Sequence, residues 1–185
     1  MALRNGPERF GAVSKAFHWG MAAMVIPLWI LGYVMVQPTQ DLLAQYELYQ
    51  LHKSFGFVVF GLGMLRLLWR SVDPAPPLPP SMHPIQRTAA QLAHLLLYGF
   101  LITLPVTGFL MSAASPLAIP TVLFDTVPVP HPIGPSEQTY AFFRGAHYYL
   151  AMGLATVLVI HVLGAIQHTL IGKDSVLQRM LPFVR

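Results

Sequence analysis

Cysteine is absent from the 185-residue chain. Without a thiolate, the protein cannot hold an iron–sulfur cluster, a thiolate-ligated haem or a covalently attached c-type haem. Any haem in this protein would therefore be of the b type, held without a covalent link.

Charged residues are also scarce. Asp, Glu, Lys and Arg make up only 10% of the chain, against about 25% in an ordinary soluble domain. Hydrophobic residues make up 55%, and the mean hydropathy is +0.56. This composition excludes an ordinary soluble domain and predicts an integral membrane protein.

Four apolar stretches are long enough for transmembrane helices, which need about 20 residues each. We predict helices over residues 14–37, 47–70, 87–112 and 142–171. The first stretch is too long for a signal peptide and lacks a small-residue cleavage site, so we expect a retained helix. The second is the weakest, because Arg66 interrupts it. We expect one all-α membrane domain over residues 1–185, built as a bundle of four transmembrane helices.

The basic residues predict the orientation of this bundle, because four spans place both termini on one side. Nine of the eleven Lys and Arg residues fall on that side: Arg4, Arg9, Lys15, Arg66, Arg70, Arg87, Lys173, Arg179 and Arg185. Lys53 and Arg144 fall on the other. The positive-inside rule then predicts cytoplasmic N- and C-termini. The sequence pI of about 9.6 follows from this topology, so no nucleic-acid partner is expected.

Two connections are rich in proline. Residues 71–84, which include the sequence DPAPPLPPSMHP, are expected to form an extended polyproline-like strap on the cytoplasmic side. Residues 113–137 contain six prolines, which argues against a fifth helix. We expect this loop to lie partly on the membrane surface and to cover the outer end of the bundle.

Histidines lie in the apolar stretches at two depths. His147 and His161 are 14 residues apart within residues 145–172, which contain no charged residue. Fourteen helical steps return to within about 40° of the same face and rise about 21 Å. Histidine in lipid is costly and marks a candidate functional site. With His18 and His52, four histidines can make one pair at each depth, and two haems are the natural occupants.

Each histidine also has an ordinary explanation. His83 and His131 lie in proline-rich loops, where a solvated side chain is expected. His52 and His147 lie near the outer helix ends, where an interfacial histidine with no ligand role is the alternative.

The inner pair has more than one solution, because His168 matches the depth of His18 better than His161 does. Irons held through His147 and His168 would lie about 31 Å apart, which spans the whole hydrocarbon core of about 30 Å. Spacing therefore favours His161. His94 and His168 are then candidates for a quinone or proton site, and interhelical hydrogen bonds are the alternative.

Three basic residues lie near the expected haem levels. Arg66 is 14 residues after His52, on nearly the same helix face and about 21 Å deeper. Its guanidinium can pair with an inner haem propionate, or it can simply reach the headgroups. Lys53 and Arg144, at the outer end, can attract an anion toward the outer haem edge.

Taken together, these residues resemble the bacterial cytochrome b561 family, the small four-helix dihaem membrane proteins. The resemblance covers nearly the whole chain. Its motifs are His18-Trp19, LHKSFG at residues 51–56, RLLWR at 66–70, AHLLLYGFLITLPVTGFLM at 93–111, His147, His161, and GKDSVLQRMLP at 172–182.

The resemblance implies that His18 and His161 hold a cytoplasmic haem and that His52 and His147 hold a periplasmic one. It implies a bacterial inner-membrane protein that transfers single electrons between a periplasmic donor, superoxide in part of the family, and membrane ubiquinone. The alternative is a relay subunit that passes electrons from a partner dehydrogenase to quinone. A third reading is a haem-free four-helix transporter or assembly factor. The sequence is also compatible with a homodimer.

Overall fold

The computed structural model describes residues 2–38, 41–170 and 176–181. Its main elements are four long helices, α1 (Ala12–Val34), α2 (Leu42–Val72), α3 (Pro84–Ala114) and α4 (Glu137–Leu170). All four are long and apolar enough to cross a membrane. Helices suit this role because they satisfy every backbone polar group internally, which lipid does not do. The chain is a mostly helical, multi-pass membrane protein.

Most helices extend beyond the apolar stretches that predicted them. α2 begins at Leu42 rather than 47, because the Asp41 side chain accepts a hydrogen bond from the Ala44 N–H at 2.8 Å and caps the helix. α3 begins at Pro84 rather than 87, with proline in the first turn and His83 as its cap. α1 differs at both ends, running from Ala12 to Val34 against the predicted 14–37.

The fourth helix also starts early, at Glu137 against the predicted 142. Its predicted last residue, 171, lies outside the described residues. Polar turns that continue a helix into the headgroups carry no hydropathy signal, which is why the apolar stretches underestimate helix length.

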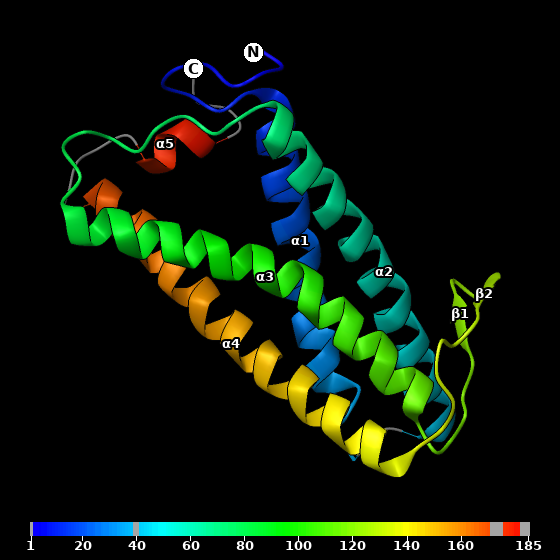
Figure 1. The fold of residues 1–185 in the computed structure, drawn as a ribbon. Coiled ribbons are helices and arrows are strands. Elements are labelled where there is room, and N and C mark those ends of the chain that lie inside the picture. The colour runs from blue at the N-terminus through cyan, green and yellow to red at the C-terminus, as the bar shows by residue number, and fades with distance from the viewer. Residues whose placement is uncertain (1, 39–40, 171–175, 182–185) are drawn as a thin grey trace.

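The helices pack as two pairs, α1 with α2 and α3 with α4, and α2 joins the pairs through α3 (Figure 1). The Trp29 indole of α1 donates to the Ala151 carbonyl of α4 at 3.0 Å. The outward faces carry exposed apolar side chains, such as Ile30, Leu68 and Val159. These faces suit contact with lipid tails.

An antiparallel hairpin of β1 (Thr121–Leu123) and β2 (Val127–Val129) lies beside α2 at the outer end of the bundle (Figure 1). Phe124 and Asp125 in its turn have φ of 47° and 56°, as a type I′ turn requires. The sequence analysis did not predict these strands. Short strands rich in proline give little pattern, and Pro128 fits here because it lies in a two-stranded ribbon.

The hairpin is fixed to α2 by buried polar side chains. Gln50 donates to the Pro120 carbonyl at 2.9 Å and accepts from the Val122 N–H at 3.3 Å. The Ser54 hydroxyl accepts from the Phe124 N–H at 2.9 Å. Gln50 is only 4% exposed and Ser54 1%, and buried polar groups of this kind are normally hydrogen-bonded. The hairpin is therefore docked against α2.

The inner end is closed by three segments that are far apart in the sequence: residues 2–11, the proline-rich strap, and α5 (Val176–Met180) (Figure 1). Lys15 donates to the Leu181 carbonyl at 2.8 Å, and the Trp19 indole donates to the Met180 carbonyl at 2.9 Å. Asn5 donates to the Asp73 carboxylate through its N–H at 3.0 Å.

Candidate functional site

Two cavities lie within the bundle, one at each end. The outer cavity, of about 310 Å³, is bounded by α2, α3 and α4, by Met35 just after the end of α1, and by the loop before β1. The inner cavity, of about 370 Å³, lies beneath the strap and α5. Both are lined mainly by apolar side chains, and each contains histidines from two or more helices.

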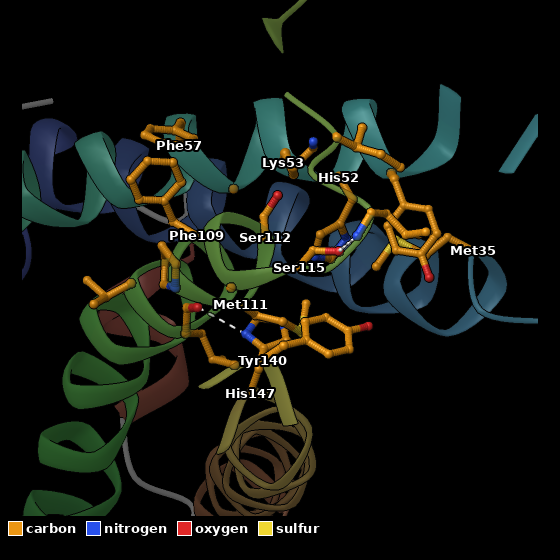
Figure 2. A pocket seen from close by; sticks show the side chains of 18 of the residues that line it. Met35, His52, Lys53, Phe57, Phe109, Met111, Ser112, Ser115, Tyr140 and His147 are labelled. Carbon is orange, nitrogen blue, oxygen red and sulfur yellow. Dashed lines mark hydrogen bonds between the residues drawn. The ribbon is translucent and has the colours of Figure 1, made fainter. Parts of the chain in front are cut away.

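The outer cavity holds His52 of α2 and His147 of α4, whose rings both lie at this cavity in Figure 2. The ring centroids are 6.4 Å apart. Two imidazoles that share one metal, each with a metal–nitrogen bond of about 2 Å, would have centroids about 6 Å apart. The separation fits one iron between the two rings.

The backbone fixes the orientation and tautomer of His147. Its Nδ1 lies 3.1 Å from the Leu104 carbonyl of α3. A carbonyl only accepts, so Nδ1 carries the proton and donates it. Nε2 is then left unprotonated, which is the form of imidazole that binds a metal.

Each ring of the outer pair lies against a glycine. A Cβ on Gly108 of α3 would lie 3.0 Å from Cε1 of His147, and one on Gly32 of α1 would lie 3.1 Å from Cε1 of His52. Nδ1 of His52 is buried and has no hydrogen-bond partner among the described residues.

The inner cavity holds three histidines. His18 of α1 and His161 of α4 have centroids 6.1 Å apart, close to the separation of the outer pair. His94 of α3 lies 5.4 Å from His161. The structure thus brings together the histidines paired by the sequence, and it adds His94 as a direct neighbour of His161.

Because of Arg66, His18 of the inner pair has the opposite tautomer to His147 of the outer pair. Its Nη2 lies 3.3 Å from Nδ1 of His18. A guanidinium only donates, so Nδ1 of His18 is the acceptor, and in the neutral ring Nε2 carries the proton. Iron could bind Nε2 only after Arg66 releases Nδ1, because the proton on Nε2 would then move to Nδ1.

The remaining predicted site residues are spread more widely. Lys53 lines the outer cavity and donates to the Pro120 carbonyl at 3.2 Å. Arg144 is exposed on α4 and does not line that cavity. His168 does not line the inner cavity. The predicted roles of Lys53, Arg144 and His168 stay predictions.

The two loop histidines differ from one another. His83 is exposed and accepts from the Ile85 N–H at 3.3 Å. His131 is only partly exposed, and its Nε2 lies 3.0 Å from the Thr121 hydroxyl. Partial burial, and to a smaller extent the positive charge of Lys53, lower the pKa of His131. His131 is therefore bonded to the buried Thr121 at the start of β1, and the expectation of an ordinary solvated side chain is wrong for it.

The site also contains residues that the sequence reasoning missed. Tyr98 of α3 and Arg70 of α2 line the inner cavity beside Arg66. Arg70 is four residues after Arg66, and Tyr98 is four residues after His94. This spacing places each residue on the same helix face as its predicted neighbour, so it was a usable signal.

The histidine arrangement fits a haem better than a bare metal ion. No group of three or more His, Asp or Glu side chains in the described part of the chain could hold a metal ion. A two-histidine site is complete only when another molecule supplies the other ligands. A haem would supply four nitrogen ligands of its own, and the two histidines of a pair would hold it.

Comparison with known proteins agrees with this chemistry. Residues 9–183 match the family described as prokaryotic cytochrome b561. The chain is 34% identical to cytochrome b561 homolog 2 of Escherichia coli K12 over 181 residues, which cover 98% of this chain and 95% of that protein. It is 24% identical to the probable superoxide oxidase CybB of Yersinia pestis over 178 residues, which cover 95% and 97% of the two chains.

A third relative covers less of the molecule. Cytochrome b561 homolog 1 of Escherichia coli K12 is 28% identical over 131 residues, which are 71% of this chain and 73% of that protein. The family match spans all four long helices, both cavities and the four paired histidines. The chain therefore belongs to the prokaryotic cytochrome b561 family of b-haem membrane proteins that transfer electrons.

Proposed function

We propose that this protein binds two b haems, an outer one between His52 and His147 and an inner one between His18 and His161. The observation that carries the proposal is the pair of similar separations, 6.4 Å and 6.1 Å, in two cavities at two levels of one bundle. A rise of about 21 Å between His147 and His161 keeps both levels within the apolar core.

The function that this arrangement supports best is transfer of single electrons from a periplasmic donor to membrane ubiquinone. A haem with two histidine ligands supplies a one-electron iron couple and has no open position for substrate. The chain's own residues hold the imidazoles, as Leu104 does for His147. They also line both sites mainly with apolar side chains.

Superoxide is the proposed donor. The full-length likeness to a probable superoxide oxidase supports this choice. Lys53 places a positive charge at the outer cavity, and Arg144 adds an exposed one on the same side, so an anion would be attracted to this end. His94, which lies in the inner cavity, is the proposed group for proton transfer to quinone, and His168 lies farther along α4.

The proposed location is the bacterial inner membrane, with both termini in the cytoplasm. The excess of Lys and Arg on that side supports the orientation. Residues 2–11 and α5 lie together at the inner end of the bundle, as this topology requires (Figure 1).

The purified protein is expected to contain two extractable b haems per chain and to reduce a ubiquinone analogue when superoxide is supplied. A pyridine-haem assay, with acid-acetone extraction, measures the haem. Quinone reduction is followed with and without superoxide dismutase, which removes the donor. One haem per chain, or haem that resists extraction, would contradict the dihaem site. Quinone reduction only after a partner dehydrogenase is added would identify a relay subunit instead.

Arg66→Leu is expected to lower the midpoint potential of the inner haem and to leave the outer haem nearly unchanged. Removing a nearby positive charge stabilises the oxidised iron, and the expected shift is on the order of tens of millivolts. Redox titration of the purified variant measures both midpoints. Arg9→Leu is the matched control, because Arg9 lies on the same side, is exposed and does not line the inner cavity. An equal shift in both variants would mean that the effect is a general one of surface charge.

A further inference from the structure

Two arginines of α2 face one aromatic ring in the inner cavity. The Arg66 guanidinium lies 5.5 Å from the centre of the Tyr98 ring, and that of Arg70 lies 5.7 Å from it. All three residues line the inner cavity. Arg66 is partly buried, whereas Arg70 is exposed, at the end of the cavity nearer the cytoplasmic surface. Cation–π contacts of this kind hold a guanidinium over the ring face.

This arrangement is electrostatically incomplete. Like charges four residues apart on a helix repel each other, and a partly buried charge is costly without a partner. The acidic residue that lines the inner cavity is Asp73, whose carboxylate accepts from Asn5. In the described residues, no carboxylate lies within ion-pair distance of Arg66 or Arg70. Two fixed positive charges in a mainly apolar cavity suit a ligand that carries two anionic groups.

We propose that Arg66 and Arg70 bind the two propionate carboxylates of the inner haem and that Tyr98 is the positioning residue that holds both guanidinium groups for them. This inference rests on the proposed inner haem and extends it to Arg70 and Tyr98. A guanidinium matches a carboxylate with two parallel hydrogen bonds. One ring that contacts both arginines reduces the freedom that each would lose when the ligand binds.

The pairing of Arg66 with a propionate also explains how His18 becomes available to iron. In this structure Arg66 donates to Nδ1 of His18 and also contacts the Met21 sulfur at 3.9 Å. When Arg66 turns to a carboxylate, Nδ1 of His18 is released and can take the proton. Nε2 is then free to bind metal, the state that His147 already has at the outer site.

The test uses the purified holoprotein and two readouts of the inner haem, its midpoint potential and the resonance Raman bending mode of its propionates. Arg70→Gln and Tyr98→Leu are each expected to shift the propionate mode and to lower the inner midpoint. Tyr98→Phe keeps the ring face, so both readouts should stay near those of the wild type. Arg9→Gln, which removes an exposed charge on the same side but outside the cavity, is the matched control.

Several outcomes would overturn the inference. One is an unmoved propionate mode and inner midpoint in Arg70→Gln with two haems bound. Another is an equal effect of Tyr98→Phe and Tyr98→Leu, which would implicate the hydroxyl. If Tyr98→Leu loses the inner haem, Arg70→Gln still provides both readouts, because Arg70 is exposed and its replacement is expected to leave the bundle intact.

The haem count separates this inference from the proposed function. A wild-type protein with only one haem would remove the basis of both, whereas two haems with unmoved readouts would contradict only the propionate site. A second comparison uses nanodiscs of phosphatidylcholine with or without phosphatidylglycerol. If Arg70→Gln changes only the response to the anionic lipid, the arginines bind lipid phosphate and the inference is wrong.

Discussion

Alanine in place of either histidine of a pair is expected to reduce the haem content from two per chain to one. His52→Ala and His147→Ala should remove the same haem, because their rings face one another 6.4 Å apart in the outer cavity. His18→Ala and His161→Ala should both remove the other. A b haem is held without covalent bonds, so losing one of its two axial ligands removes a main part of its attachment. Pyridine-haem assay and redox titration of each variant measure which haem remains.

The retained haem is the internal control for folding, because it reports that the bundle is intact. His83→Asn is a further control, since His83 is exposed and asparagine preserves the cap of α3. The critical comparison is His94→Ala, because His94 lies only 5.4 Å from His161. Loss of a haem in His94→Ala but not in His18→Ala would show that α3 supplies the inner ligand. Loss of a haem in His168→Ala but not in His161→Ala would show that the inner partner of His18 is His168, which matches its depth, and not His161, which the spacing from His147 favours.

The histidine pairs illustrate what the sequence predicts well. The interval of 14 residues between His147 and His161 depends only on helix geometry, so it placed the two rings at two levels of one face before any packing was known. In the structure these rings face His52 and His18, respectively. The four spans were likewise predictable, because runs without charged residues are long enough to cross lipid.

The details of the site required the structure. The hydrogen bond from Arg66 to His18 depends on side-chain rotamers that no spacing predicts. The proximity of His94 to His161 depends on how α3 rotates against α4. The docking of the hairpin against α2 depends on Gln50 and Ser54, two polar residues in the outer half of α2 to which the sequence analysis assigned no role. Tertiary contacts determine all three features.

Gly108→Val is expected to abolish outer haem binding although Gly108 touches no metal. A Cβ at this position would lie 3.0 Å from Cε1 and 3.2 Å from Nδ1 of His147. The His147 ring cannot move away freely, because its Nδ1 is bonded to the carbonyl of Leu104, which lies one turn before Gly108 on α3. A branched side chain would therefore displace the imidazole, break this bond and turn Nε2 away from the iron. The haem assay should return about one haem per chain, with the inner midpoint unchanged.

Gly99→Val on the same helix is the matched control, because a Cβ at Gly99 would meet no atom within 4 Å. It introduces the same β-branched side chain into α3 and should keep both haems. Gly32→Val should reproduce the loss from the other side of the cavity, since a Cβ on Gly32 would lie 3.1 Å from Cε1 of His52. Two bound haems and an unchanged outer midpoint in Gly108→Val would mean that His147 binds haem in another orientation. The expected result is loss of the outer haem in Gly108→Val and Gly32→Val but not in Gly99→Val. It would mean that each imidazole needs the space that a glycine without a side chain leaves beside it.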